Sequence, residues 1–268
     1  MVIQWLQQNS NEGLRYGRQP IPALLPWHQI WITQFPSVWQ VPIEHLISLY
    51  GATDFQHAFA QFVIQQCNPK IRPAQIEHKV PNFHLPFTTM SVYHCIKFCK
   101  VDQELESSIA DSIYIQPPCW AKNGHIIPCC FNMALLDSGK KNQTGIRTLR
   151  VAQIRVVFCI SCEAAHHLFP HTINVPEHLA YVEWFTPFQA MPDANDSLYK
   201  ISHSMMGNSR MSSIIPIRNI VQSIHLIPLV GENIPWEWYS STILDNCSSF
   251  LLNSFSDIRT YCLFNKIH

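Results

Sequence analysis

The hydrophobic residues of this chain occur mainly in short runs or in alternation with polar residues, and the runs stop at proline or glycine. The most apolar runs are residues 179–188, 213–220 and 223–231, which are rich in β-branched and aromatic side chains. Such side chains pack well on a pleated surface. We therefore expect these three segments to be strands of a buried sheet, around which the rest of the chain is arranged.

Other segments alternate in the manner of strands, with turn signals such as Pro117-Pro118 and Asn123-Gly124 between them. They are residues 91–98, 112–116, 130–136, 150–158, 198–202 and 260–264. The polar stretches 101–108, 137–145 and 205–212 are expected to be loops. Many short strands separated by turns favour a strongly bent antiparallel sheet or a small barrel.

Helical spacing is clearest after Thr53 and Gln56, which form a capping-box pattern. The apolar residues that recur there at helical spacing are Phe55, Ala58, Phe59, Phe62 and Val63. This pattern predicts a helix over residues 53–66, and a short helix is also expected within residues 241–252. Residues 1–40, where prolines are dense, are expected to be irregular.

The composition of the chain is informative mainly about its surface. Hydrophobic residues make up 47% of the chain and charged residues only 13%, against roughly 25% charged residues in ordinary domains. Ser, Asn, Gln and His must then cover much of the surface, which suggests either modest solubility or a surface that is normally covered by something else. The formal net charge is zero, with no basic excess, so we expect weak or no direct binding to nucleic acid.

The expected location is intracellular. The N-terminus lacks a basic region followed by a long apolar core, so it does not resemble a secretory signal. No uncharged apolar run approaches the ~20 residues of a membrane span, so no membrane association is expected. The ten cysteines are irregularly spaced, which favours reduced thiols rather than a disulfide framework.

One group of residues could hold a metal ion. Cys159 and Cys162 form a Cys-x-x-Cys pair, and His166 and His171 follow it, with His167 between them. Thiolates and imidazoles are the ligands that zinc prefers. The histidines follow more closely than in a zinc finger, which leaves about a dozen residues between the two halves. The alternative is therefore a strand end that runs into a His-rich loop.

Catalytic motifs are not evident. Neither Gly-x-Ser-x-Gly nor His-Glu-x-x-His occurs, and no cofactor is expected. The carboxylates that could converge on a metal in a nuclease-like site are widely spaced in the sequence: Asp54, Glu77, Asp137, Asp193 and Asp245. Ordinary surface acids are the alternative. Three of them within metal-bridging distance would distinguish the two interpretations.

The order of several phrases resembles the C-terminal region of proteins encoded by Plavaka-type DNA transposons of mushroom-forming (basidiomycete) fungi. The matching phrases lie at residues 50–58, 73–78, 151–158 (Val-Ala-Gln-Ile-Arg-Val-Val-Phe), 176–185 (Pro-Glu-His-Leu-Ala-Tyr-Val-Glu-Trp-Phe), 199–202, 214–228 and 255–257. They cover about residues 48–264. The chain departs from the family at residues 121–130, where an Arg- and Gly-rich linker is typical, and at Cys159 and Cys162.

This resemblance implies an accessory region rather than a catalytic one, because the family's DDE-type transposase domain would lie upstream of it. The segments with Val-Glu-Trp-Phe, Ile-Pro-Ile and His-Leu-Ile-Pro are also similar to the bromo-adjacent homology (BAH) barrel of chromatin proteins. The predicted fold is α+β and mainly β: a helical N-terminal lead-in, residues 1–72, and a BAH-like or SH3-like antiparallel β-barrel, residues 73–268.

The expected function is a non-enzymatic protein- or chromatin-interaction module in a truncated, transposon-derived protein, and the nucleus is one intracellular location that would suit it. Two alternatives stay open: a metal-dependent, transposase-related nuclease, and a zinc-stabilised binding module.

Overall fold

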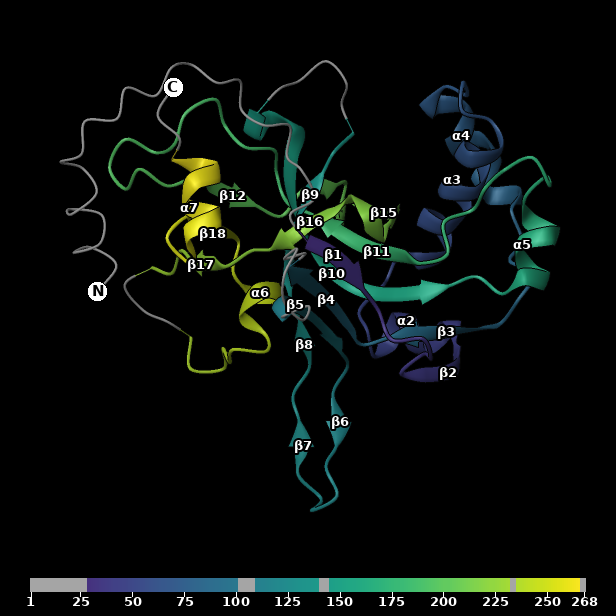
Figure 1. The fold of residues 1–268 in the computed structure, drawn as a ribbon, viewed down its shortest axis with the longest axis horizontal. Helices are drawn as coiled ribbons and strands as arrows, with labels where there is room; N and C mark the ends of the chain where they lie inside the picture. Colours follow the sequence, from purple (N-terminus) through teal and green to yellow (C-terminus); the bar gives the residue numbers. More distant parts are fainter. Residues whose placement is uncertain (1–27, 101–108, 140–144, 232–234, 266–268) are drawn as a thin grey trace.

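A seven-stranded antiparallel sheet is the centre of the fold. The computed structural model describes residues 28–100, 109–139, 145–231 and 235–265 (Figure 1). The longest strand, β10 (Leu149–Cys159), pairs with β11 (Leu179–Trp184), which pairs with β15 (Ser212–Pro216). Every residue of β11 is buried, as are all residues of β10 from 151 to 158. The segment expected at the centre of the sheet is thus confirmed as a buried strand, with β10 beside it.

The other edge of β10 is shared by two strands. Its first half pairs with β9 (Met133–Asp137), which pairs with β16 (Ile220–Ser223). Its second half pairs with β3 (Thr89–Tyr93), which pairs with β2 (Val38–Pro42). The sheet therefore forks on this side: β9 and β16 form one branch, and β3 and β2 form the other.

A second sheet has the order β1 (His28–Trp31), β4 (Cys95–Lys100), β5 (Ile109–Gln116) and β8 (Cys130–Phe131). Single residues join it to the first sheet: His94 separates β3 from β4, and Asn132 separates β8 from β9. Between β5 and β8 the chain extends into an arm, residues 117–129. It contains β6 (Cys119–Trp120) and β7 (Ile126–Ile127) and projects from the body (Figure 1).

A smaller C-terminal layer contains the sheet β12 (Lys200–Ser202), β18 (Ser249–Leu252) and β17 (Leu226–Pro228). The short helices α6 (Ile243–Asn246) and α7 (Ile258–Phe264) flank it, and β13 (Met205–Met206) forms a hairpin with β14 (Ser209–Arg210). This layer has its own apolar cluster, which includes Phe185, Phe250 and Phe264.

Helices cover the other face of the large sheet. They are α2 (Ile43–Ser48), α3 (Phe55–Cys67), α4 (Pro73–Lys79) and α5 (Cys162–Leu168). The 3-10 turns are η1 (Val80–Asn82), η2 (Gly145–Thr148) and η3 (Ile217–Asn219), and Ile146 of η2 packs against the C-terminal layer instead. The apolar face expected on the first helix packs inward: Phe55 lies 5.4 Å from Phe158 and 5.9 Å from Tyr181 between ring centroids. The predicted helix over residues 53–66 is confirmed as α3, but the capping box expected at Thr53 and Gln56 is wrong: Asp54 precedes the helix and no side chain caps it.

The α+β, mainly β class is confirmed, but the barrel is corrected. Among the described residues the strands form open sheets and do not close into a BAH-like or SH3-like barrel. At the ends of the large sheet, β15 pairs only with β11 and β2 only with β3. Because α3 packs against β15, this end of the sheet is covered by a helix rather than by another strand.

The N-terminal region also differs from the expectation. Residues 1–27 lie outside the described residues, so the lead-in is not shown there, and residues 28–42 contain β1 and β2 instead of an irregular segment. Prolines precede and end these strands, where an extended backbone is favoured. Residues on both sides of position 72, including Phe59 and Val157, belong to one apolar cluster, so residues up to 72 have no separate core in the described part.

Two C-terminal expectations were wrong. Residues 260–264 belong to helix α7 rather than to a strand, because the Asp257 side chain accepts a hydrogen bond from the Thr260 amide (2.8 Å) and caps the helix. Residues 205–212 include the β13–β14 hairpin rather than only a loop, with Gly207 at φ 62° in its turn. The acidic stretch 101–108 lies outside the described residues.

Candidate functional site

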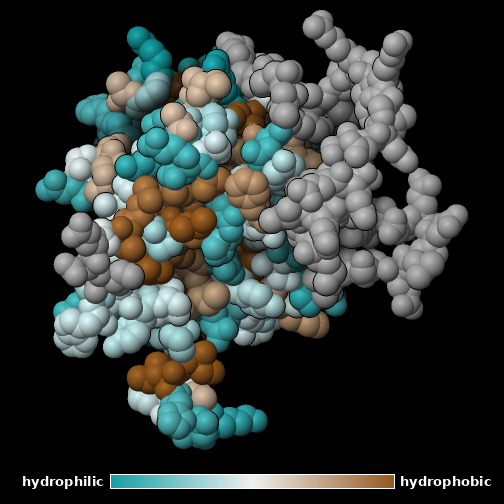
Figure 2. Space-filling model, turned by 90° about the vertical axis from the view of Figure 1, so that its left-hand side faces the viewer, coloured by the Kyte–Doolittle hydropathy of each residue, from teal (hydrophilic) through white to brown (hydrophobic). Residues whose placement is uncertain are grey.

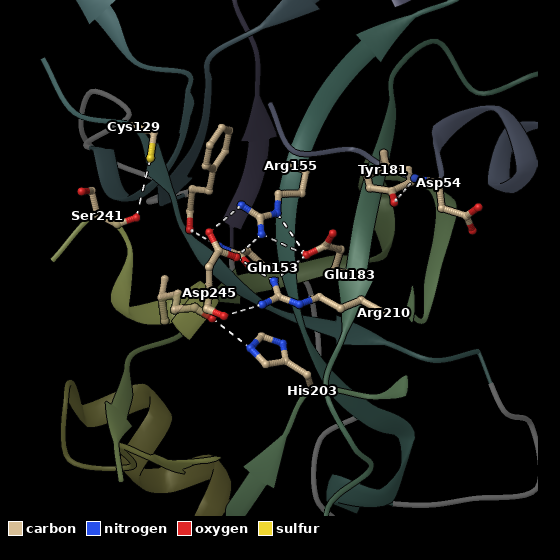
Figure 3. Close-up of polar contacts among 12 residues, drawn as sticks. Asp54, Cys129, Gln153, Arg155, Tyr181, Glu183, His203, Arg210, Ser241 and Asp245 are labelled. Carbon is tan, nitrogen blue, oxygen red and sulfur yellow. Dashed lines mark hydrogen bonds and ion pairs between the residues drawn. The ribbon is translucent and has the colours of Figure 1, made fainter. Parts of the chain in front are cut away.

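Two arginines and two carboxylates meet where β10, β11, β14 and α6 converge, with Arg155 and Glu183 in the interior and Arg210 and Asp245 closer to the surface (Figure 3). We call Arg155, Glu183, Arg210 and Asp245 the charge network. Its geometry begins with a β-bulge: the register of β10 against β11 shifts between Ile154 and Val156, so Arg155 has no direct partner across the ladder. A bulge re-aims the side chain of the extra residue, and here that side chain meets Glu183 of the neighbouring strand.

Each arginine of the charge network contacts both carboxylates. Arg155 donates from Nε and Nη2 to Glu183 Oε2 (3.1 and 3.0 Å) and from both Nη atoms to the Asp245 carboxylate. Arg210 donates from Nη1 to Glu183 Oε2 (3.0 Å) and to Asp245 Oδ1 (2.6 Å), and from Nη2 to the Asp245 backbone carbonyl (2.8 Å). Two positive and two negative charges therefore neutralise one another, and α6 is tied to the large sheet.

Burial and the neighbouring charges shift the pKa values of these groups in opposite directions. Arg155 and Glu183 are only 5% and 3% exposed. Burial alone would lower the pKa of Arg155, but Glu183 and Asp245 outweigh it, and the pKa is raised. Burial would raise the pKa of Asp245, yet the hydrogen bonds and charges of Arg155 and Arg210 lower it. Both groups consequently stay charged at neutral pH.

The surroundings of Arg155 are shaped to hold its guanidinium. Its centre lies 5.3 Å from the centroid of the Phe131 ring, a cation–π contact. Gly51 also lies against the guanidinium, since a Cβ at position 51 would be 3.5 Å from Arg155 Nη1. The φ angle of Gly51 is 73°, a conformation that favours glycine.

Two polar side chains beside the network are incompletely paired. His203 Nε2 lies 2.9 Å from the Leu244 carbonyl, while Nδ1 is buried with no partner among the described residues. Burial lowers the pKa of His203, with Arg210 adding to the effect. Gln153 donates to the Phe131 carbonyl (3.4 Å), but its Oε1 has no partner in the described part of the chain.

The arrangement favours a structural role for the network. A general base or metal ligand needs a carboxylate that is free to take a proton or a cation, whereas both carboxylates here are engaged by arginines. Arg155 and Glu183 were not singled out in the sequence, although opposite charges within two otherwise apolar strands were a usable signal. Arg210 lay in an expected loop, and no sequence pattern links it to Asp245.

The predicted metal ligands are not brought together. Cys159 ends β10 and its Sγ accepts a hydrogen bond from the Tyr93 hydroxyl (3.7 Å), while Cys162 is exposed at the start of α5. The rings of His166 and His171 lie 5.5 Å apart between centroids. Within the described ranges, no group of three or more His, Cys, Asp or Glu side chains is arranged to hold a metal ion.

The expected His-rich loop is a helix, α5. Ser161 caps it by accepting a hydrogen bond from the Ala164 amide (3.2 Å), and Ser is a favourable residue at this position. On the helix Cys162 and His166 lie one turn apart, but Cys159 belongs to the strand before the cap.

The carboxylates considered for a nuclease site are also separated. Asp54 accepts a hydrogen bond from Ser212 (3.1 Å), Glu77 accepts one from Gln61 (2.6 Å), and Asp245 belongs to the charge network. Asp137 and Asp193 accept hydrogen bonds from backbone amides of their own turns. Three acids within metal-bridging distance, the arrangement that would favour a nuclease, do not occur in the described part of the chain.

The fold and the charge network define an α+β domain with open antiparallel sheets and an internally neutralised ionic centre. The chain belongs to the family described as a domain of unknown function (DUF6830), which matches residues 25–206. Arg155 and Glu183 lie within the matched residues, and Arg210 and Asp245 lie beyond them. No curated protein and no solved structure matches the chain. None of the described helices is long and apolar enough to span a membrane.

Proposed function

We propose that this chain is a non-enzymatic interaction module, the accessory C-terminal region of a Plavaka-type transposon protein, and that its arm binds a protein partner. One observation carries the proposal: the arm presents large apolar side chains to water. Trp120 is 74% exposed, Ile126 60% and Ile127 43%. The resemblance of the phrases between residues 48 and 264 supports the transposon origin.

The arm is built to protrude rather than to pack. Its strands β6 and β7 pair only with each other, with Trp120 opposite Ile126 and Cys119 opposite Ile127. Figure 2 shows apolar residues on the arm, beyond the main surface of the body. A two-stranded ribbon is marginally stable by itself, and exposed apolar groups gain free energy when a partner covers them.

The residue types of the arm favour a protein partner over nucleic acid. Trp is among the residues that contribute most to protein interfaces, usually by filling an apolar pocket. The arm carries Lys122 and His125 but no other basic side chain, whereas a phosphate-binding surface needs several cations. A protein with an apolar cleft, such as a chromatin protein in the nucleus, is therefore the proposed partner.

The charge network supports a non-enzymatic role. Its two carboxylates are each hydrogen-bonded to two arginines, so neither is free to act as a base or to bind a metal. The proposed role of the network is to hold the body rigid while the arm binds.

The test compares the wild-type chain with the double variant Trp120→Ser/Ile126→Ser. Proteins captured from a nuclear extract are identified, purified, and titrated against both chains by calorimetry. We expect the double variant to bind the purified partner about 10-fold or more weakly, as for loss of a central interface residue. The matched control is Trp236→Ser, which removes an indole that is 82% exposed outside the arm.

Equal loss in the control, or full affinity in the arm variant, would contradict the proposal. Sedimentation velocity of the wild-type chain tests the remaining possibility: if the arm binds only a second copy of this chain, the partner proposal fails.

A further inference from the structure

A groove is lined by the C-terminal end of α3, by α4 and by the residues between them. These two helices lie away from the arm (Figure 1). The groove has a volume of about 890 Å³. The residues that line it are Cys67, Asn68, Pro69, Lys70, Ile71, Ala74, Gln75, His78 and Lys79. None of them belongs to the charge network or to the arm, so the groove is a separate surface.

The rim of the groove is cationic. Lys70 and Lys79 line the groove and are exposed, and no ion pair involves them among the described residues. The nearby acid, Glu77, is engaged elsewhere: its carboxylate accepts from Gln61 (2.6 Å) and lies 3.2 Å from His57 Nε2. Two lysines thus line one groove without acidic partners among the described residues.

The lining between these cations is largely apolar. Cys67 and Ile71 are half-buried, and Pro69 and Ala74 contribute further carbon atoms. The Cys67 thiol donates to the Leu168 carbonyl (3.5 Å), and burial raises its pKa, so it stays protonated at neutral pH. An apolar floor below a cationic rim can bind a ligand that carries negative charges beside an apolar group.

We infer that the α3–α4 groove binds a short acidic peptide segment with an apolar side chain between its carboxylates. The cations of the rim would pair with Asp or Glu side chains, and Ile71 and Ala74 would contact the apolar one. Because α4 has seven residues, it is about 10 Å long, which is the span of about three extended peptide residues. The recognised motif is therefore short.

Nucleic acid fits this groove less well. A duplex carries regularly spaced phosphates, and its binding scales with the number of cations that neutralise them. The groove offers only two lysine side chains among its lining residues, on a chain with no net charge, and its floor is largely apolar. A peptide can satisfy both features at once.

The probe is a fluorescein-labelled peptide of sequence Ser-Asp-Glu-Leu-Asp-Glu-Ser, titrated with the full chain and followed by fluorescence anisotropy. We expect saturable binding that weakens about 10-fold or more in Lys70→Glu/Lys79→Glu, because two attractive contacts become repulsive. The matched control, Lys200→Glu/Arg218→Glu, makes the same charge change at two exposed cations outside the groove and the arm and should bind as the wild type does.

A second variant separates the shape of the groove from its charge. Ala74→Trp fills the groove without changing the net charge, and we expect it to weaken peptide binding as well. Circular dichroism melting of each variant shows whether it is folded. A peptide with Asn and Gln in place of Asp and Glu should not bind.

Four results would overturn the inference: no saturable binding of the probe, equal loss in the control charge reversal, unchanged binding in Ala74→Trp, or tighter binding of a short DNA duplex that depends on Lys70 and Lys79. These results concern the groove alone, and they leave the proposal for the arm to its own test.

Discussion

At the scale of single residues, the charge network is the most demanding feature of this chain. Moving a charged group out of water costs several kcal/mol, and the cost is offset only when its partners and hydrogen bonds are complete. Arg155 and Glu183 are both buried and meet this condition through Asp245 and Arg210. Removing one residue of the charge network should therefore destabilise the fold more than removing an exposed charged residue would.

We predict that Glu183→Gln destabilises the fold by about 3–5 kcal/mol, because the buried Arg155 would lose its buried carboxylate partner and keep only the partly exposed Asp245. The measurement is urea denaturation followed by circular dichroism. The control Glu237→Gln changes an exposed glutamate and should shift the free energy of unfolding by less than about 0.5 kcal/mol. Equal effects of the two substitutions would show that the network does not stabilise the fold.

At the scale of elements, α3 and the arm differ in whether their apolar side chains are buried. The apolar side chains of α3 are buried against Phe158 and Tyr181, so this helix depends on the large sheet and contributes to its core. The strands of the arm pair with each other, and their large side chains stay in water. The arm is thus an element that the body can lose without losing its core.

We predict that replacing residues 117–129 by Asn-Gly leaves the body folded. Gln116 and Cys130 already face each other as a cross-strand pair, so a two-residue type I′ turn can join them. The hydrogen bond from Cys129 to the Ser241 carbonyl would be lost, at a cost of about 1 kcal/mol. The expected shift of the melting temperature is a few degrees, measured by calorimetry.

The same variant should no longer bind the partner of the arm. A loss of the cooperative melting transition would instead show that the arm is required for folding, and the proposed division between body and arm would then be wrong.

At the scale of the whole molecule, one strand joins the two apolar clusters. Leu149 and Val151 of β10 belong to the C-terminal cluster, and Ala152 and Ile154 belong to the larger one. Successive side chains of a strand point to opposite faces, so β10 serves both clusters. The C-terminal layer cannot unfold without exposing one side of the strand at the centre of the large sheet.

We therefore predict a single cooperative unfolding transition for the full chain, measured by circular dichroism melting. Because the structure does not bring Cys159, Cys162, His166 and His171 together, a zinc chelator should leave the melting temperature unchanged. A lower melting temperature with chelator, together with stoichiometric zinc in the purified protein, would support the zinc-stabilised module. Two separate transitions would contradict the shared role of β10.

Local patterns were sufficient for much of the fold. Alternation and apolar runs predicted β10, β11 and most of the strands that the structure contains, and helical spacing after Thr53 predicted α3. These strands and this helix could be predicted because the spacing of apolar residues along a segment indicates which of its faces is buried. The segment 260–264 was ambiguous for the same reason: its residue types suit a strand, but the cap at Asp257 favours a helix.

The sequence by itself determined that the protein is mainly β, with a buried sheet, one strong amphipathic helix and few charges. Only the tertiary structure decided that the sheet forks instead of closing, that the arm projects with Trp120 exposed, and that Arg155 meets Asp245. Arg155 and Asp245 are 90 residues apart in the chain. Such contacts depend on how bends at His94 and Asn132 and the bulge at Arg155 orient whole elements, and spacing along the chain carries no information about that orientation.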